Sequence, residues 1–244
     1  MVVAASLSAP RHHFGLRHAV VRRRGSTLLG PVTLALPPVG LTIVLGPNGA
    51  GKTTMLRAMH GLDRLSEGEV LSDEPLQAAR RKQGFVFQSP IMLRRSVRAN
   101  LAYPLKLDRV PSGQAAEAVE RWAKRTGLTA VIDNPAPSLS GGEKQKLALA
   151  RALIRKPELV FLDEPCANLD GRSTREIEEL LSEAVEDGTR IVMTTHNIAQ
   201  ARRLATDAVF LFQGLIHEQG PADRFFDQPQ RPETQGFLKG DLIE

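Results

Sequence analysis

The motif GPNGAGKT at residues 46–53 constrains the fold of this chain more than any other feature. It follows the apolar run LTIVL and precedes a helical pattern, the context in which such a loop cradles phosphate oxygens with its backbone N–H groups. Lys52 would place its ammonium on the β- and γ-phosphate oxygens, and Thr53 would offer a hydroxyl to Mg²⁺. The predicted phosphate-binding residues are Gly46, Pro47, Asn48, Gly49, Ala50, Gly51, Lys52, Thr53 and Thr54.

Apolar runs of strand length alternate with helical patterns along the rest of the chain. These runs occupy residues 84–88, 159–164, 190–195 and 208–212. Between the second and third of them, apolar side chains recur on one helical face at Ile177, Leu180, Leu181, Ala184 and Val185. The alternation predicts an α/β fold with a mostly parallel sheet covered by helices. The stretch 90–155 is mostly helical in pattern and is predicted to be an insertion into that core.

Charge and composition narrow the classes of function. The net charge of the 244 residues is +5, and basic residues cluster at 22–24, 80–82 and 94–98. Such clusters fit solvated faces, with nucleic acid or an anionic membrane as alternatives, but no nucleic-acid-binding motif accompanies them. No apolar run approaches the roughly 20 residues that span a bilayer. The N-terminus does not have the pattern of a cleaved signal, and the single Cys166, interpreted as a small buried side chain, excludes an intrachain disulfide.

Polar side chains that could act on a bound phosphate stand at the ends of three apolar runs. Asp163 is predicted to share Mg²⁺ with Thr53, and the next residue, Glu164, could polarise an attacking water as general base. His196 could contact the γ-phosphate or hold Glu164 and the water in place, and Gln88 could sense Mg²⁺ and water. The acidic pair and His196 also have plainer interpretations, because an acidic pair often caps a helix and a lone histidine is often structural.

The segment SLSGGE (138–143) has the features of a second phosphate site. Ser140 and Glu143 alone predict a capping box at the start of a helix. That motif does not explain Gly141 and Gly142, since glycine destabilises a first helical turn by roughly 0.5–1 kcal/mol relative to alanine. Two glycines at this point are expected where another group approaches the backbone closely.

The order of these motifs resembles that of the ATP-binding cassette (ABC) ATPases of transporters. In order they are GPNGAGKT, Gln88, LSGGE, LVFLDEP, NLD and TTH, and the resemblance covers roughly residues 14–230. It implies a P-loop NTPase core with a mostly parallel sheet, a small N-terminal antiparallel β part and an inserted helical subdomain. It implies a single ABC ATPase domain over residues 1–244, with a core lobe at about 14–89 and 156–230, a helical subdomain at about 90–155 and a tail at 231–244. The polar, Pro-containing composition of this tail predicts that it is loosely held.

The resemblance also implies a head-to-tail homodimer in which two copies sandwich two ATP molecules. Ser140, Gly141 and Gly142 would then face the γ-phosphate held by the phosphate loop of the other copy. Asp170 would belong to the loop that communicates between the two sites, and Gln88 with the segment after it would couple hydrolysis to a membrane partner.

Two departures from the family pattern bear on function. Glu143 stands where the family most often has glutamine, and a carboxylate in a first helical turn is expected to cap it without loss of function. The tyrosine on which the family usually stacks adenine is missing from the stretch VVRRRGSTLL. Arg23 or Arg24 stands near that position, where a guanidinium plane could stack on the base or lie in a solvated loop.

The predicted function is that of the ATPase subunit of a membrane importer, peripheral on the cytoplasmic face of the membrane. The resemblance implies two transmembrane permease subunits, an extracytoplasmic solute-binding protein, ATP and Mg²⁺, and no nucleic acid. The rivals are a soluble ABC ATPase that acts on DNA or the ribosome, and an inactive assembly protein, which conflicts with intact Lys52, Asp163 and Glu164. The segment FVFQSPIMLRRSVRANLAYPL resembles ATPases that import tungstate and related oxyanions, with phosphate and polar amino acid importers close in pattern.

Overall fold

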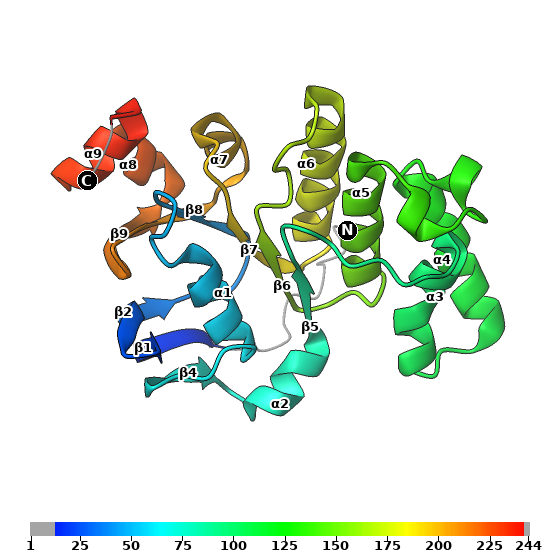
Figure 1. The fold of residues 1–244 in the computed structure, drawn as a ribbon, viewed down its shortest axis with the longest axis horizontal. Coiled ribbons are helices and arrows are strands. Elements are labelled where there is room, and N and C mark those ends of the chain that lie inside the picture. Colours follow the sequence, from blue (N-terminus) through cyan, green and yellow to red (C-terminus); the bar gives the residue numbers. More distant parts are fainter. Residues whose placement is uncertain (1–12, 242–244) are drawn as a thin grey trace, which may run out of the picture.

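The computed structural model describes residues 13–241. The N-terminal stretch considered as a possible signal lies almost wholly outside these residues, and so do the last three residues of the tail. Its larger sheet has six strands in the order β5-β6-β7-β3-β8-β9 (Figure 1). The first five of these are parallel, and β9 pairs with β8 in the antiparallel sense. The strands are β3 (Leu41–Leu45), β5 (Gln83–Val86), β6 (Leu159–Asp163), β7 (Arg190–Thr194), β8 (Asp207–Phe212) and β9 (Leu215–Pro221).

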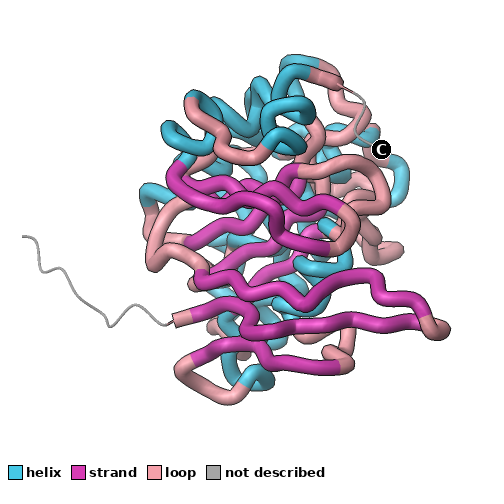
Figure 2. Tube along the Cα trace, turned by 90° about the vertical axis from the view of Figure 1, so that its left-hand side faces the viewer, coloured by secondary structure: helices cyan, strands magenta, loops and turns pink. Residues whose placement is uncertain are grey.

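A smaller antiparallel sheet lies against one side of this core. Its strands are β1 (Phe14–Arg23), β2 (Ser26–Ala35) and β4 (Glu67–Ser72), in the order β2-β1-β4. In Figure 2 these long strands lie below the strands of the larger sheet. The N-terminal antiparallel part expected from the sequence is therefore present.

Helix α1 (Lys52–His60) fills the space between the two sheets. Its Met55, Leu56 and Met59 are fully buried. They belong to one apolar cluster with side chains of β1 and β2 and with those of the larger sheet that face the smaller one. Because side chains alternate along a strand, Val44 joins this cluster while its neighbours on β3 face the other way. The helix that follows the phosphate loop is thus held rigidly from both sides.

The opposite face of the larger sheet packs against helices of the insertion and of the core. Helix α6 (Gly171–Glu186) buries the apolar face predicted from its periodicity, and α5 (Gly141–Leu153) lies beside it. Helices α3 (Val97–Leu107) and α4 (Ser112–Arg125) complete the insertion (Figure 1). The remaining helical segments are α2 (Leu76–Ala79), η1 (Arg80–Lys82), η2 (Thr129–Val131), η3 (Ala136–Ser138), α7 (Ile198–Leu204), α8 (Ala222–Asp227) and α9 (Pro232–Lys239).

The end of the chain differs from the loosely held tail that the sequence indicated. Residues 232–239 form α9, in which the side chain of Thr234 is fully buried. The ring centroid of Phe237 lies 5.2 Å from that of Phe210 on β8. These contacts join residues far apart in sequence, so the polar composition of the segment could not show them.

None of the helices within residues 13–241 is long and apolar enough to cross a membrane.

His60, the last residue of α1, is a buried imidazole in an aromatic surrounding. Its ring centroid lies 5.5 Å from that of Phe85 and 5.8 Å from that of Phe161, and its Nδ1 has no hydrogen-bond partner among the described residues. Burial, and to a smaller degree the charge of Arg80, lowers the pKa of His60 to about 4. The neutral ring therefore fits this pocket and the protonated ring does not.

This burial makes the free energy of unfolding depend on pH. In the unfolded chain His60 titrates near 6.5, so between pH 6.5 and 4 the unfolded state binds the extra proton and is favoured. We predict that His60 alone lowers the free energy of unfolding by about 2 kcal/mol between pH 7 and pH 5, from the shift to about 4. Urea denaturation at both pH values, for the wild type and for His60→Phe, measures this loss. The variant should lose about that much less than the wild type, and an equal loss in both proteins would contradict the assignment.

Candidate functional site

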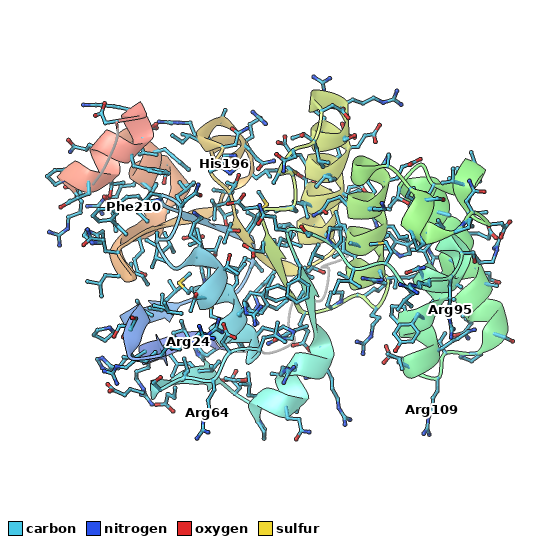
Figure 3. The ribbon with its side chains drawn as sticks, viewed as in Figure 1. Arg24, Arg64, Arg95, Arg109, His196 and Phe210 are labelled. Carbon is cyan, nitrogen blue, oxygen red and sulfur yellow. The ribbon has the colours of Figure 1, made fainter. Side chains whose placement is uncertain are left out.

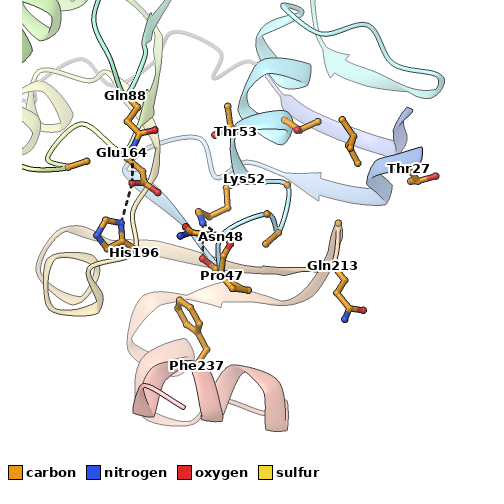
Figure 4. A pocket seen from close by; sticks show the side chains of 18 of the residues that line it. Thr27, Pro47, Asn48, Lys52, Thr53, Gln88, Glu164, His196, Gln213 and Phe237 are labelled. Atoms are coloured by element: carbon orange, nitrogen blue, oxygen red, sulfur yellow. Dashed lines mark hydrogen bonds and ion pairs between the residues drawn. The ribbon is translucent and has the colours of Figure 1, made fainter. Parts of the chain in front are cut away.

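A cavity of about 980 Å³ opens at the carboxyl ends of the parallel strands (Figure 4). The phosphate loop and the first residues of α1 form its floor, since the cavity is lined by every residue from Gly46 to Thr54. Gln88, Glu164 and His196 contribute from the loops that follow β5, β6 and β7. In an α/β sheet this edge is the usual place of ligand binding, so the residues predicted from three distant runs do meet around one space.

The geometry of the phosphate loop explains its glycines at two positions. Gly46 has φ of 151°, and a Cβ built there would lie 2.0 Å from the carbonyl oxygen of Leu211. Gly51 has φ of 99° and is the N-cap of α1, with no side chain that accepts a hydrogen bond from the first turn. The first N–H groups of α1 therefore have no side-chain cap, and the positive end of the helix dipole faces the cavity, which is suited to an anion.

Lys52 lies at the start of α1 and is nearly buried, with 7% of its surface exposed. Its Nζ donates hydrogen bonds to the carbonyl oxygens of Gly46, at 2.8 Å, and Pro47, at 3.0 Å. Burial lowers the pKa of Lys52, while the nearby carboxylates of Glu164 and Asp163 act in the opposite direction. The ammonium is held across the mouth of the loop, beside the place where phosphates would be cradled.

The carboxylate of Asp163 is a centre of hydroxyl contacts. Its Oδ1 accepts hydrogen bonds from Thr53 Oγ1, at 3.0 Å, and from Thr194 Oγ1, at 2.8 Å. The sequence analysis missed Thr194, although it is the first threonine of the TTH motif and is fully buried beside Asp163.

The donor set around Asp163 fits Mg²⁺. A carboxylate oxygen and a hydroxyl are hard ligands, and Mg²⁺ in phosphate sites takes one or two protein ligands together with phosphate oxygens and water. In the part of the chain that the structure describes, no group of three or more His, Cys, Asp or Glu residues could hold a metal ion. The pair of Thr53 and Asp163 thus suits an ion that arrives with a phosphate substrate, rather than one held by the protein alone.

Glu164, His196 and Gln88 form a second polar group in the cavity. His196 Nδ1 lies 3.1 Å from Glu164 Oε2, and Gln88 Nε2 lies 3.5 Å from the same oxygen (Figure 4). Glu164 has φ of 46°, a strained conformation for a non-glycine residue, and its N–H donates to Thr194 Oγ1 at 2.9 Å. Its side chain is mostly buried, whereas that of His196 is 64% exposed. Gln88 stands two residues beyond the end of β5, which is shorter than the predicted strand.

Ser140 and Glu143 form the capping box that the sequence predicted. Glu143 Oε2 accepts the N–H of Ser140 at 2.8 Å, and Ser140 Oγ accepts the N–H of Glu143 at 3.4 Å. Ser140 Oγ also donates to Glu143 Oε2, at 2.7 Å, and this bond, together with the one from the Ser140 N–H, lowers the pKa of Glu143. The capping role expected for this carboxylate is confirmed by its geometry.

The two glycines after Ser140 have different surroundings. A Cβ on Gly142 would lie 2.8 Å from Ser173 Oγ, so a contact within the chain already favours glycine there. A Cβ on Gly141 would meet nothing within 4 Å, so that position is open. Neither glycine lines the cavity of the phosphate loop, and neither do Ser140 and Asp170. The carboxylate of Asp170 caps α6 by accepting the N–H groups of Arg172 and Ser173, at 2.9 and 2.8 Å.

The arginines considered for stacking on a nucleobase do not line the cavity. Arg23 Nη2 lies 3.5 Å from Asp63 Oδ1, and Arg24 lies in the turn between β1 and β2, away from His196 (Figure 3). Thr27 at the start of β2 and Phe237 from α9 line the cavity instead. Neither residue was predicted from the sequence. The position of Phe237 depends on the docking of α9 onto the core.

The family model described as "ABC transporter" matches residues 29–167, more than half of the chain. The chain is 39% identical over 204 residues to the tungstate uptake system ATP-binding protein TupC of Peptoclostridium acidaminophilum, a match that covers 83% of this chain and 94% of that protein. It is 34% identical over 237 residues to the phosphate import ATP-binding protein PstB 2 of Natronomonas pharaonis, covering 90% and 84% of the two chains.

Solved structures agree with this relationship. The cbiO1 protein of Clostridium perfringens, described as part of the transporter complex cbiONQ, superposes with a TM-score of 0.78 at 26% identity, covering 88% of this chain and 90% of that one. A dimeric ATP-binding cassette in a post-hydrolysis state, bound to ADP and phosphate, gives a TM-score of 0.77 at 27% identity, with coverage of 86% and 98%. The chain belongs to the ABC transporter family and is an ABC-type ATPase. The family resemblance and the α/β fold class inferred from the sequence are thereby confirmed.

Thr194 offers a sharp test of the geometry around Asp163. Thr194→Val keeps the side-chain volume but removes the hydroxyl that bonds both Asp163 and the N–H of Glu164. We predict at least a tenfold loss of Mg²⁺-dependent ATP hydrolysis, with the affinity for metal-free ATP, measured by fluorescent-nucleotide displacement, changed less than twofold.

Thr194→Ser retains the hydroxyl and is the matched control. It should hydrolyse ATP at close to the wild-type rate. Equal activity in Thr194→Val and the wild type would show that this hydroxyl has no part in the site.

Proposed function

We propose that this chain is the ATPase subunit of an ABC importer for a small oxyanion, with tungstate as its cargo. The hydrolytic role is carried by one observation, the convergence of Glu164, His196 and Gln88 on one side of the phosphate loop. The cargo assignment is supported by the likeness to a tungstate uptake ATPase. Phosphate is the second candidate, because the relative from Natronomonas pharaonis is a phosphate import protein.

The phosphate loop binds ATP in this proposal. The backbone N–H groups of residues 46–54 surround the phosphates, and Lys52 contacts the β- and γ-phosphate oxygens. Thr53, Asp163 and Gln88 would hold Mg²⁺, which neutralises charge on the phosphate oxygens when it is bound with the nucleotide.

Glu164 acts as general base. It takes a proton from the attacking water as the water oxygen bonds to the γ-phosphorus and the bond from that phosphorus to the bridging oxygen of ADP breaks. The products are ADP and inorganic phosphate, and the proton passes on to solvent or phosphate. His196, 3.1 Å from Glu164 Oε2, holds the carboxylate in place, and Gln88 contributes from the opposite side of the same oxygen.

The site is completed by a second copy of the chain. Ser140, Gly141 and Gly142 lie at the N-terminus of the 13-residue helix α5, where the helix dipole and the backbone N–H groups of the first turn favour an anion. They do not line the cavity of their own phosphate loop, and Gly141 has open space around it. In the proposed homodimer this turn faces the γ-phosphate bound by the other copy, with Asp170 near the same interface, and the dimeric structural relative is consistent with this arrangement.

The groove between the insertion and the core is the proposed docking surface for the two permease subunits. Tyr103 and Leu107 on α3 are 41% and 62% exposed and line a cavity of about 380 Å³. Arg151 of α5 lines the same cavity and donates to the carbonyl oxygen of Ile91, at 2.8 Å, in the segment after Gln88. The complex would place this chain on the cytoplasmic face of the membrane, with an extracytoplasmic protein delivering the solute.

Two substitutions together test hydrolysis and dimerisation. Glu164→Gln should slow ATP hydrolysis by roughly 10²-fold or more, the scale of a positioned acid–base group, while nucleotide binding persists. The variant should therefore accumulate as an ATP-bound dimer, measured on a sizing column with ATP and Mg²⁺ and with the permease subunits where needed. Adding Ser140→Arg should disperse that dimer, because the long side chain obstructs the approach of the turn to the opposite phosphate.

A helix cap alone predicts a different result for Ser140→Arg. It would lower the stability of α5 by about 1 kcal/mol and leave association unchanged. If Ser140→Arg changes neither the trapped dimer nor the ATPase rate, the second phosphate site is only a cap.

The cargo is tested in cells. Deleting the gene for this chain should abolish high-affinity uptake of tungstate, measured by mass spectrometry of cell metal content, and leave phosphate uptake intact. Lost phosphate uptake with normal tungstate accumulation would reverse the assignment.

A further inference from the structure

Three buried polar side chains form a hydrogen-bonded network behind the loop that carries His196. Thr195, Gln200 and Glu178 are 5%, 1% and 8% exposed. Thr195 Oγ1 donates to Gln200 Oε1 at 2.9 Å, and Gln200 Nε2 donates to Glu178 Oε1 at 3.1 Å. This polar network therefore runs from the end of β7, through α7, to the middle of α6.

Glu178 is the charged end of the polar network, and both of its carboxylate oxygens accept hydrogen bonds. Arg203 Nη2 donates to Glu178 Oε1 at 2.7 Å, and Arg203 Nε donates to Oε2 at 3.0 Å. Gln200 and Arg203 are three residues apart on α7, so both face α6. A buried carboxylate is tolerated only when its oxygens accept hydrogen bonds. Since the donors to Glu178 are on α7 and Glu178 is on α6, these bonds hold the two helices together.

The same contacts fix the backbone on both sides of His196. Thr195 Oγ1 accepts the N–H of Asn197 at 3.1 Å, and Asn197 Oδ1 accepts the N–H of Gln200 at 3.0 Å as the cap of α7. The side chain of His196 is 64% exposed, and within residues 13–241 its one polar contact is with Glu164. An exposed ring with one contact keeps its place only if the backbone beneath it is rigid.

We propose that Glu178 is a positioning residue for ATP hydrolysis, which holds His196 against Glu164 through Gln200 and Thr195. This inference rests on the roles proposed above for His196 and Glu164. Glutamine at position 178 could keep the contact with Gln200 but not the pair of charge-assisted bonds with Arg203. The alternative is an ion pair that stabilises the packing of α6 on α7 without any effect on the site.

The experiment combines Glu178→Gln with His196→Ala in the full-length chain. Single-turnover and steady-state assays with MgATP measure the rate of hydrolysis and the KM of each variant. Glu178→Gln alone should lower the rate about tenfold and change KM less than twofold. In the His196→Ala background, whose slow rate single-turnover assays resolve, Glu178→Gln should have no further effect. Glu183→Gln, an exposed position on α6 paired with Arg125, is the matched control and should keep the wild-type rate.

The outcomes separate this inference from the proposed function. If His196→Ala slows hydrolysis and Glu178→Gln does not, the inference fails while the role of His196 stands. An equal factor for Glu178→Gln in both backgrounds also overturns it, since the effect then does not pass through His196. If His196→Ala leaves the rate unchanged, the role of His196 and this inference fail together. Should thermal melting show that Glu178→Gln does not fold, Thr195→Val, which removes only a hydroxyl, takes its place in the same cycle.

Discussion

The buried carboxylate of Asp163 is the contact on which the arrangement of the site depends. One of its oxygens accepts hydrogen bonds from Thr53 on α1 and from Thr194 on β7, so a single group joins the phosphate-loop helix to two neighbouring strands. Thr194 also accepts the N–H of Glu164 and thereby holds that residue in its strained conformation. Because α1 is packed between two sheets, these short contacts fix the distance between the cradle for phosphate and the carboxylate proposed as base.

The chain has two helix N-termini proposed to bind phosphate, and they do not line the same cavity within one copy. The N-terminus of α1 faces the cavity, and that of α5 lies outside it, capped by Ser140 and Glu143. A contact links α5 to the next helix, since Gly142 packs against Ser173 in the first turn of α6. In the proposed dimer, α6 would therefore connect the turn that faces the partner's phosphate with the polar network of Thr195, Gln200 and Glu178 behind His196.

Local patterns in the sequence were sufficient for the fold class and for much of the site. The phosphate loop, the strand ends and the capping box each depend on a few adjacent residues, whose spacing reports their geometry directly. The features that were missed or wrong arise from contacts between distant segments. Thr194 enters the site through its hydrogen bond to Asp163. Arg23 pairs with Asp63 and does not line the cavity. The position of α9, and so of Phe237 in the cavity wall, follows from packing on β8.

In the proposed dimer one copy supplies the phosphate loop and the other supplies the turn at Ser140. Cys166 is the only cysteine of the chain, so a Cys166→Ser background allows disulfide crosslinking at chosen positions. One protein would carry Asn48→Cys and a differently sized second one Ser140→Cys, both with Glu164→Gln, and the mixture would be oxidised with and without MgATP. We predict a crosslinked heterodimer on a non-reducing gel that forms only with MgATP. Absence of that crosslink, in a mixture that a sizing column shows to be dimeric, would contradict it.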